Sequence, residues 1–442
     1  PDPENARGNI FGLVNTAVKG GRNVTSAFLE VLAPVWKQLE LSLAGRVDKY
    51  PGIKTNFVPK FGVKWQANDM VLLRGSYSEG FRAPAVSQIT PGGAQYFLNN
   101  LRDPVRCNLE ATPPVPKPGA DATDCNKSIS GVGGYNPNLK PENSYSSSLG
   151  LVINPTRDVD LLLSYYRIRK NGEVALASGQ SIIDNPASYP PGSLVRDTNP
   201  ALLLDGVPGT GPLLNIFTPW LNQGSTMTSG YDFEIKVVTR ADDFKWTNAL
   251  NGNYALRYEH AEQPGFAKNN LVGTRGGIAD FSTSSPDIPR LKFRAVSTFE
   301  IGAQGFMFAS NYVSGVSFWR QMDGTNLPGV TPQYYSGTTC HYGGSNPDNV
   351  PSRSVQGAAP TATNGRDLYI NRYPGCSMDK WMTFDVGYTY TGFKNMTLSL
   401  NIQNFTDEKA PYDPTGGQIG YNAGLHNPYG RYFTVSASYK FW

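Results

Sequence analysis

The feature that most constrains this sequence is a stretch of about ten residues, alternately apolar and polar, that recurs about a dozen times. In residues 431–442, for example, Phe433 and Val435 alternate with Thr434 and Ser436. Period-two alternation gives a β-strand one apolar and one polar face. A single strand of this kind would also suit a soluble sandwich. If a dozen share one wall, the apolar face needs lipid and the polar face needs water, which predicts a transmembrane antiparallel β-barrel.

Short turns and long loops alternate between the predicted strands. The strands are expected at residues 24–33, 38–47, 57–66, 69–79, 144–153, 158–169, 229–238, 245–258, 290–301, 305–316, 381–390, 396–404 and 431–442. The long loops are expected at 80–143, 170–228, 259–289, 317–380 and 405–430. Outer-membrane barrels have short periplasmic turns and long extracellular loops. We therefore predict an all-β protein of the bacterial outer membrane, with a periplasmic C-terminus.

The number of predicted strands, about thirteen, is odd, whereas bacterial single-chain barrels have even numbers. With a periplasmic C-terminus, an odd number makes residues 1–23 an extracellular segment that enters the barrel. Residues 24–442 then form the C-terminal part of the barrel. We expect that this chain does not close a barrel alone, and that the first strands are missing or on another chain.

The composition argues against several other classes of protein. No run approaches eighteen apolar residues, so no transmembrane helix is predicted. Only 17% of the residues are charged, and no dense Lys/Arg run is present, which disfavours nucleic-acid binding. The three histidines, His260, His341 and His426, fall in predicted loops and are interpreted as solvated. No catalytic set, metal site or cofactor is predicted, so the chain is not expected to be an enzyme.

The four cysteines form two sequence-local pairs, each in a loop rich in Pro, Gly and Asn. None has the CxxC spacing that is typical of zinc sites. We interpret Cys107 with Cys125, and Cys340 with Cys376, as loop disulfides formed in an oxidising compartment. The alternative is four unpaired thiols.

Three separated motifs resemble those of the TonB-dependent outer-membrane receptors, and they occur in matching order over most of residues 24–442. The first is GSYSEGFRAP at 75–84, which ends on Phe81, Arg82, Ala83 and Pro84. The second is YNPNLKPE at 135–142, which contains Asn136, Pro137, Asn138, Leu139, Lys140, Pro141 and Glu142. The third is NIQNFTDEK at 401–409, followed by Pro411-Tyr412 and the final strand after Gly430.

The resemblance implies a plugged barrel of about 22 strands, of which this chain carries the C-terminal part. The implied partners are an N-terminal plug, the remaining barrel strands, the TonB complex acting through the plug, and outer-membrane lipid. A surface lipoprotein is a further candidate partner. The implied function is TonB-coupled import of a scarce or large extracellular nutrient: siderophore-iron, an oligosaccharide, a peptide or cobalamin. No cofactor is implied.

Three other functions fit parts of the pattern. A structural or adhesive surface protein could bind another protein through the long, disulfide-braced loops, and this alternative stays open. A passive porin is disfavoured by the long loops and the receptor motifs. Residues 81–84 and 136–139 look like the two boxes that flank an axial histidine in haem receptors. However, no histidine lies between Pro84 and Asn136, which disfavours haem uptake.

Candidate site residues follow from these expectations. Ligand contacts are expected from side chains at the rim and in the long loops: Arg82, Trp220, Trp319, Arg320, Tyr334 and Tyr335. Polar residues expected to face the lumen are Glu40, Arg46, Arg74, Lys292, Arg294 and Glu300. Aromatic residues expected to face lipid are Trp36, Tyr231, Trp246, Tyr258, Trp381, Tyr388 and Phe441. The C-terminal barrel signal is expected at Tyr439, Phe441 and Trp442.

Overall fold

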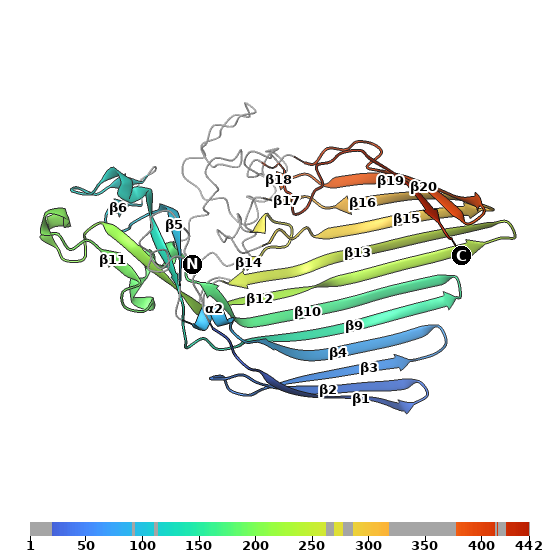
Figure 1. Cartoon of the computed structure of the whole chain (residues 1–442), viewed down its shortest axis with the longest axis horizontal. Helices are drawn as coiled ribbons and strands as arrows, with labels where there is room; N and C mark the ends of the chain where they lie inside the picture. Colours follow the sequence, from blue (N-terminus) through green and yellow to red (C-terminus); the bar gives the residue numbers. More distant parts are fainter. Residues whose placement is uncertain are drawn as a thin grey trace, which may run out of the picture.

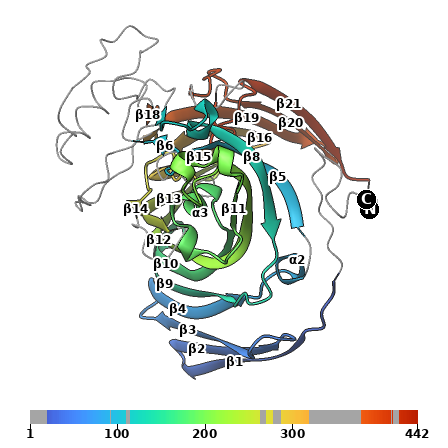
Figure 2. The ribbon, with the colours of Figure 1, turned by 90° about the vertical axis from the view of Figure 1, so that its left-hand side faces the viewer.

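The structure is a computed structural model that describes residues 20–90, 93–109, 114–261, 269–276, 286–317, 377–411, 413 and 421–441. Long antiparallel strands form a curved wall (Figures 1 and 2). In order along the wall they are β1 (Thr25–Trp36), β2 (Leu39–Lys49), β3 (Asn56–Gln66), β4 (Val71–Arg82), β9 (Glu142–Thr156), β10 (Val159–Leu176), β12 (Leu213–Arg240), β13 (Phe244–Ala261), β15 (Leu291–Ile301), β16 (Gln304–Val313), β19 (Trp381–Phe393), β20 (Met396–Gln403) and β21 (Tyr432–Tyr439). The predicted fold class is confirmed, and the described residues contain the predicted number of about thirteen wall strands.

The other elements are short and lie in the long loops. The short strands are β5 (Gly93–Leu101), β6 (Cys107–Asn108), β7 (Val115–Pro116), β8 (Lys127–Gly134), β11 (Leu194–Arg196), β14 (Asn269–Asn270), β17 (Val316–Ser317) and β18 (Ser377–Met378). The helical turns are α2 (Val86–Ile89), α3 (Gly179–Asp184), η1 (Ala122–Cys125), η2 (Pro186–Ser188), η3 (Pro200–Leu202) and η4 (Leu204–Gly206). No helix among the described residues is long and apolar enough to cross a membrane.

Two neighbouring rows of paired residues show that the wall has one apolar and one polar face. The apolar row runs from β2 to β19 through Leu39, Trp65, Leu73, Leu151, Leu163, Phe233, Gly252, Phe293, Tyr312 and Met382. The polar row runs from β2 to β15 through Glu40, Lys64, Arg74, Gly150, Ser164, Asp232, Asn253 and Lys292. Paired residues of adjacent strands share a face, so the alternation read in single strands continues around the wall.

Most residues predicted to face lumen or lipid lie on the expected face, but two aromatic residues do not. Trp381 pairs with Val313, which pairs with Lys292, so Trp381 extends the polar row. Tyr258 pairs with Thr228, beyond an irregularity in β13 that follows the pairing of Gly230 with Ala255. A bulge inserts one residue and reverses the alternation, so Tyr258 is on the polar face. Trp381 and Tyr258 therefore lie on the polar face, and the prediction that places them with the apolar residues is wrong.

The two ends of the wall differ. Figure 1 shows hairpin turns and the C-terminus at one end, and the folded long loops at the other. We call these the short-turn end and the long-loop end. Three strands extend into the long-loop end: β10, β12 and β13, which are 18, 28 and 18 residues long in total. A transmembrane strand needs only about 9–11 residues, so these three strands continue well beyond a bilayer. The sequence predicts a loop for residues 170–176 of β10 and 213–228 of β12, but these residues are strand.

Parts of the first two long loops fold together into one unit, which we call the loop domain (residues 93–109, 114–134 and 177–219). Its sheet contains β5, β8, the start of β12, and β11, and β8 pairs with β12 in parallel. Its core comprises Leu101, Ile129, Ala177, Ile182, Ile183, Tyr189, Leu213 and Ile216. Because these residues come from both loops, neither half could bury them alone. Figure 2 views the loop domain from the long-loop end.

Candidate functional site

The first two family motifs meet at the rim, where the loop domain joins the wall. Arg82 ends β4, and it pairs with Glu142, which begins β9. The Arg82 Nη2 atom lies 2.5 Å from the Glu142 Oε1 atom. The same carboxylate oxygen accepts the backbone N–H of Val174 at 2.6 Å, and Glu142 is 8% exposed. The predicted ligand contact Arg82 is thus held in place by a buried acid, while its own side chain is 68% exposed.

The asparagines of the rim hold the second motif against β12. The Asn136 Nδ2 atom donates to the Trp220 carbonyl at 2.8 Å. Asn222 accepts the Lys140 N–H and donates to the carbonyls of Lys140 and Gly172, each at 2.8 Å. Hydrogen bonds to main-chain groups fix the path of a segment that has no regular secondary structure. The second motif therefore positions the loop domain on the wall.

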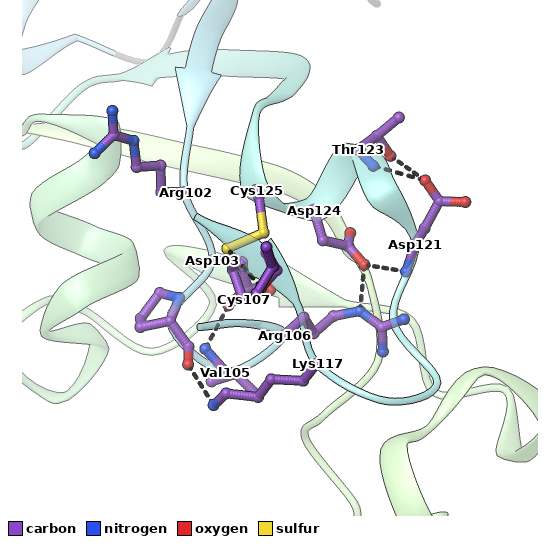
Figure 3. The surroundings of a disulfide bond; sticks show 12 residues. Arg102, Asp103, Val105, Arg106, Cys107, Lys117, Asp121, Thr123, Asp124 and Cys125 are labelled. Atoms are coloured by element: carbon purple, nitrogen blue, oxygen red, sulfur yellow. Dashed lines mark hydrogen bonds and ion pairs between the residues drawn. A yellow bond between two sulfur atoms is a disulfide. The ribbon is translucent and has the colours of Figure 1, made fainter. Parts of the chain in front are cut away.

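A disulfide and a buried ionic network stabilise the far part of the loop domain (Figure 3). The predicted disulfide Cys107–Cys125 is present, with the two Cα atoms 5.3 Å apart. Next to it, the Arg106 Nε atom lies 2.7 Å from the Asp124 Oδ2 atom, with exposed side-chain fractions of 3% and 0%. Burial alone would raise the pKa of Asp124, but hydrogen bonds from Arg106 and Lys127 outweigh it and hold that pKa below its usual value.

The same network connects the two loops that form the domain. The Arg106 Nη1 atom donates to the carbonyls of Leu202 at 3.0 Å and Thr210 at 2.6 Å. Arg196 makes a two-pronged ion pair with the fully buried Asp103, at 2.6 and 2.8 Å. Arg106 and Asp103 come from the first long loop. Their partners Arg196, Leu202 and Thr210 come from the second. Bidentate, buried pairs of this kind specify one arrangement of the two loops.

A second polar cluster lies on the polar face, on the neighbouring strands β10, β12 and β13. Thr226 on β12 donates to Glu173 on β10 at 2.5 Å, and its hydroxyl lies 3.1 Å from the Nδ1 atom of His260 on β13. Lys170 lies 3.6 Å from Glu173 and is 53% exposed. His260 is therefore part of a strand and hydrogen-bonded, so the interpretation of this residue as a solvated loop histidine is wrong.

The other predicted site residues lie in different parts of the chain, and some lie outside the described residues. Trp220 lies on β12 opposite Leu176, and its side chain is half-buried beside the rim. Tyr439 and Phe441 lie at the chain end with their ring centroids 5.0 Å apart, and both are largely exposed. Other predicted residues lie outside the described part of the chain: Trp319, Arg320, Tyr334, Tyr335, Cys340, Cys376, His341 and Trp442.

Sequence reasoning missed several residues that build this site. Asn222, Arg106 and Asp103 have no local signal for the contacts that join the two loops to each other and to the wall, because Lys140, Thr210 and Arg196 are 82, 104 and 93 residues away in the chain. The described residues contain no group of three or more His, Cys, Asp or Glu side chains that could hold a metal ion. The arrangement is a rigid, polar rim with two exposed cationic side chains, Arg82 and Lys170, each anchored by a recessed carboxylate. Such a rim can bind and orient a polar solute.

The wall has the fold of a transmembrane β-barrel, and comparison with known proteins identifies the family. Residues 2–405 match the family described as "TonB dependent receptor-like, beta-barrel". The chain belongs to the TonB-dependent receptor-like β-barrel family, whose members are proteins of the bacterial outer membrane. A search of curated protein sequences returned no match.

Several solved structures have a similar fold. The siderophore receptor PirA from Acinetobacter baumannii is 15% identical with a TM-score of 0.57, covering 95% of this chain and 46% of that one. A mutant of the ferric enterobactin receptor PfeA from Pseudomonas aeruginosa is 14% identical with a TM-score of 0.56, covering 97% and 47%. The outer membrane transporter YddB from Escherichia coli is 14% identical with a TM-score of 0.51, covering 95% and 45%. The chain thus spans about half the length of these structures.

Proposed function

We propose that this chain forms the ligand-receiving part of a TonB-dependent transporter that imports a scarce extracellular nutrient. The observation that carries the proposal is the family match over residues 2–405, together with a wall whose polar face ends in a rigid rim. On this proposal the apolar face contacts lipid, the polar face lines the lumen, and the long-loop end faces the outside of the cell. The short-turn end and the C-terminus then lie in the periplasm.

The partners proposed for the lumen are a plug and, through the plug, the TonB complex. The polar face supports this proposal, because it presents charged and amide side chains such as Lys64, Asp232, Asn253 and Lys292 across several strands. A polar wall can hydrogen-bond a folded plug and still release it, since each exposed polar contact is worth little on its own. The family match is the basis for both partners.

A ferric siderophore is the substrate class that we propose first. PirA and PfeA are named as a siderophore receptor and a ferric enterobactin receptor, and they share this fold. Arg82 and Lys170 support an anionic or strongly polar ligand, because both cationic groups are exposed at the rim. Oligosaccharide and peptide ligands are the alternatives that the growth experiment below separates.

A surface-adhesion function is the second candidate. The observation that favours it is the loop domain, which has its own core, a disulfide and buried ion pairs. A rigid projection can bind a macromolecule without losing much conformational entropy. An adhesin of this kind would bind its partner equally well in cells that lack TonB.

The substrate class can be tested by growth of a strain that lacks the intact gene. We expect the deletion strain to grow normally on ferrous iron, sugars and peptides, and to fail on one or more ferric siderophores as the sole source of iron. Supplying the intact gene should restore growth, whereas the gene with Arg82→Glu should restore it poorly, because reversing the charge removes an exposed cation and its pairing with Glu142. Normal growth on every siderophore, with failure on an oligosaccharide or peptide source, would overturn the siderophore proposal.

A further inference from the structure

A separate set of contacts joins two other long loops. Residues 269–276 follow β13, and residues 421–427 precede β21. Arg275 forms an ion pair with Asp287 and donates from Nη2 to the Asp413 Oδ2 atom at 2.8 Å. Asn422 donates from Nδ2 to the Asp287 Oδ2 atom at 2.6 Å. We call these contacts, together with His426, the latch. They hold the loop that precedes the last strand against the loop that follows β13.

His426 lies inside the latch. It is 5% exposed, and its ring packs edge-on against Trp381, with the ring centroids 5.4 Å apart. Its backbone N–H donates to the Asn422 carbonyl at 2.9 Å, which fixes the turn. Among the described residues, the side-chain Nδ1 atom of His426 and the Nε1 atom of Trp381 are buried without a hydrogen-bond partner. This environment accommodates a neutral imidazole, and the described residues offer no hydrogen-bond acceptor to a proton added at the Nδ1 atom.

Charged groups near His426 change its pKa in both directions. Burial is the main reason that the pKa of His426 is below its ordinary value; Arg275 on the opposite loop and Lys292 on β15 lower it further. Asp413 and Asp287 act in the opposite direction. Both carboxylates already pair with Arg275, so they compensate an additional cation only in part. The latched form therefore binds a proton at His426 more weakly than an open form does.

We propose that the latch is a pH-sensitive contact, and that protonation of His426 separates residues 421–427 from residues 269–276. The direction of the pH dependence follows from the linkage between proton binding and the stability of the closed latch. Because the pKa of His426 is lower in the closed form of the latch than in the open form, the closed form is fully stable above the ordinary histidine pKa of about 6.5. It loses stability as the pH drops below that value. At pH 5.5 the open form gains up to about tenfold over the closed form. The inference concerns the opening of the loops and does not depend on which ligand is transported.

Backbone amide hydrogen exchange of the full-length protein in detergent or lipid tests this proposal. Between pH 7.5 and 5.5, after correction for intrinsic rates, we expect exchange in residues 269–276 and 421–427 to accelerate by up to about tenfold. Exchange in β9 and β10 should stay unchanged. In His426→Gln the acceleration should disappear, whereas His260→Gln, which changes the other histidine in the described residues, should keep it. Equal protection of the wild-type latch at both pH values would overturn the proposal, and so would an acceleration that persists in His426→Gln.

A second measurement needs no substitution and covers the case in which His426→Gln does not fold. Slow exchange of the imidazole C2 hydrogen, followed by mass spectrometry, reports the pKa of each histidine in the native protein. We expect the pKa of His426 to be below the ordinary value of about 6.5. A value at or above 6.5 would mean that the closed latch binds the proton at least as well as the open form, and the proposal would then be wrong.

Discussion

Replacing Arg106 with methionine is expected to unfold the loop domain and leave the wall intact. The guanidinium is 3% exposed, pairs with the fully buried Asp124, and connects the first loop to the carbonyls of Leu202 and Thr210 in the second. Among the described residues, Lys127 is then the one cation that still pairs with the buried carboxylate. Breaking a buried pair in this way costs about 3–5 kcal/mol of folding free energy. Hydrogen exchange should therefore accelerate strongly in the loop domain (residues 93–109, 114–134 and 177–219).

Lys409→Met provides a matched control, because it removes an ion pair whose members are exposed. Lys409 and Asp407 lie 2.9 Å apart, with exposed side-chain fractions of 77% and 41%. An exposed pair contributes at most about 1 kcal/mol, so this variant should exchange like the wild type. If Arg106→Met also left exchange in the loop domain unchanged, the two loops would not form a cooperative unit, and the domain described above would be wrong.

Placing an arginine on the apolar face of β9 is expected to destabilise the protein in a bilayer. Leu149 is 61% exposed and pairs with Tyr165 in the adjacent strand, so it lies on the apolar face, which we propose contacts lipid. A cation near the bilayer midplane of a barrel costs about 2–4 kcal/mol. Leu149→Arg should lower the free energy of unfolding in lipid vesicles by that amount, measured by urea titration of the full-length protein.

The neighbouring residue on the same strand gives the control. Ser148 lies on the polar face, where its hydroxyl is 2.8 Å from that of Ser76. Ser148→Arg loses one neutral hydrogen bond and places the charge in water, so it should cost no more than about 1 kcal/mol. If Ser148→Arg were the more costly of the two variants, the assignment of the apolar face to lipid would be reversed.

The wall could be predicted from the sequence because its signal is local. In β15, Leu291, Phe293 and Ala295 alternate with Lys292 and Arg294, and the alternation alone identifies both the strand and its faces. The prediction fails where one residue breaks the alternation. Tyr258 lies past a bulge that nothing in the composition of β13 indicates, because the bulge is set by pairing with β12.

The loop domain could not be predicted because its signal is not local. Ile129 and Ile216 pack in one core although 87 residues separate them in the chain, and neither belongs to a long periodic segment. The disulfide was predictable because Cys107 and Cys125 are only 18 residues apart. For the second motif, the resemblance identified the residues but not their task. The hydrogen bonds of Asn136 to β12, and of Asn222 to the motif, become visible only in the structure.

Uptake of a labelled ligand in matched strains with and without TonB is the most direct test of the proposed transport function. We expect cells that carry the intact gene to accumulate the ligand only when TonB is present and the inner-membrane proton gradient is maintained. Cells that lack TonB should still bind the ligand at their surface, because the rim and the loop domain do not require energy to bind. Accumulation that is equal with and without TonB would contradict the account and would favour passive diffusion. Surface binding of a protein partner, with no accumulation in either strain, would favour adhesion.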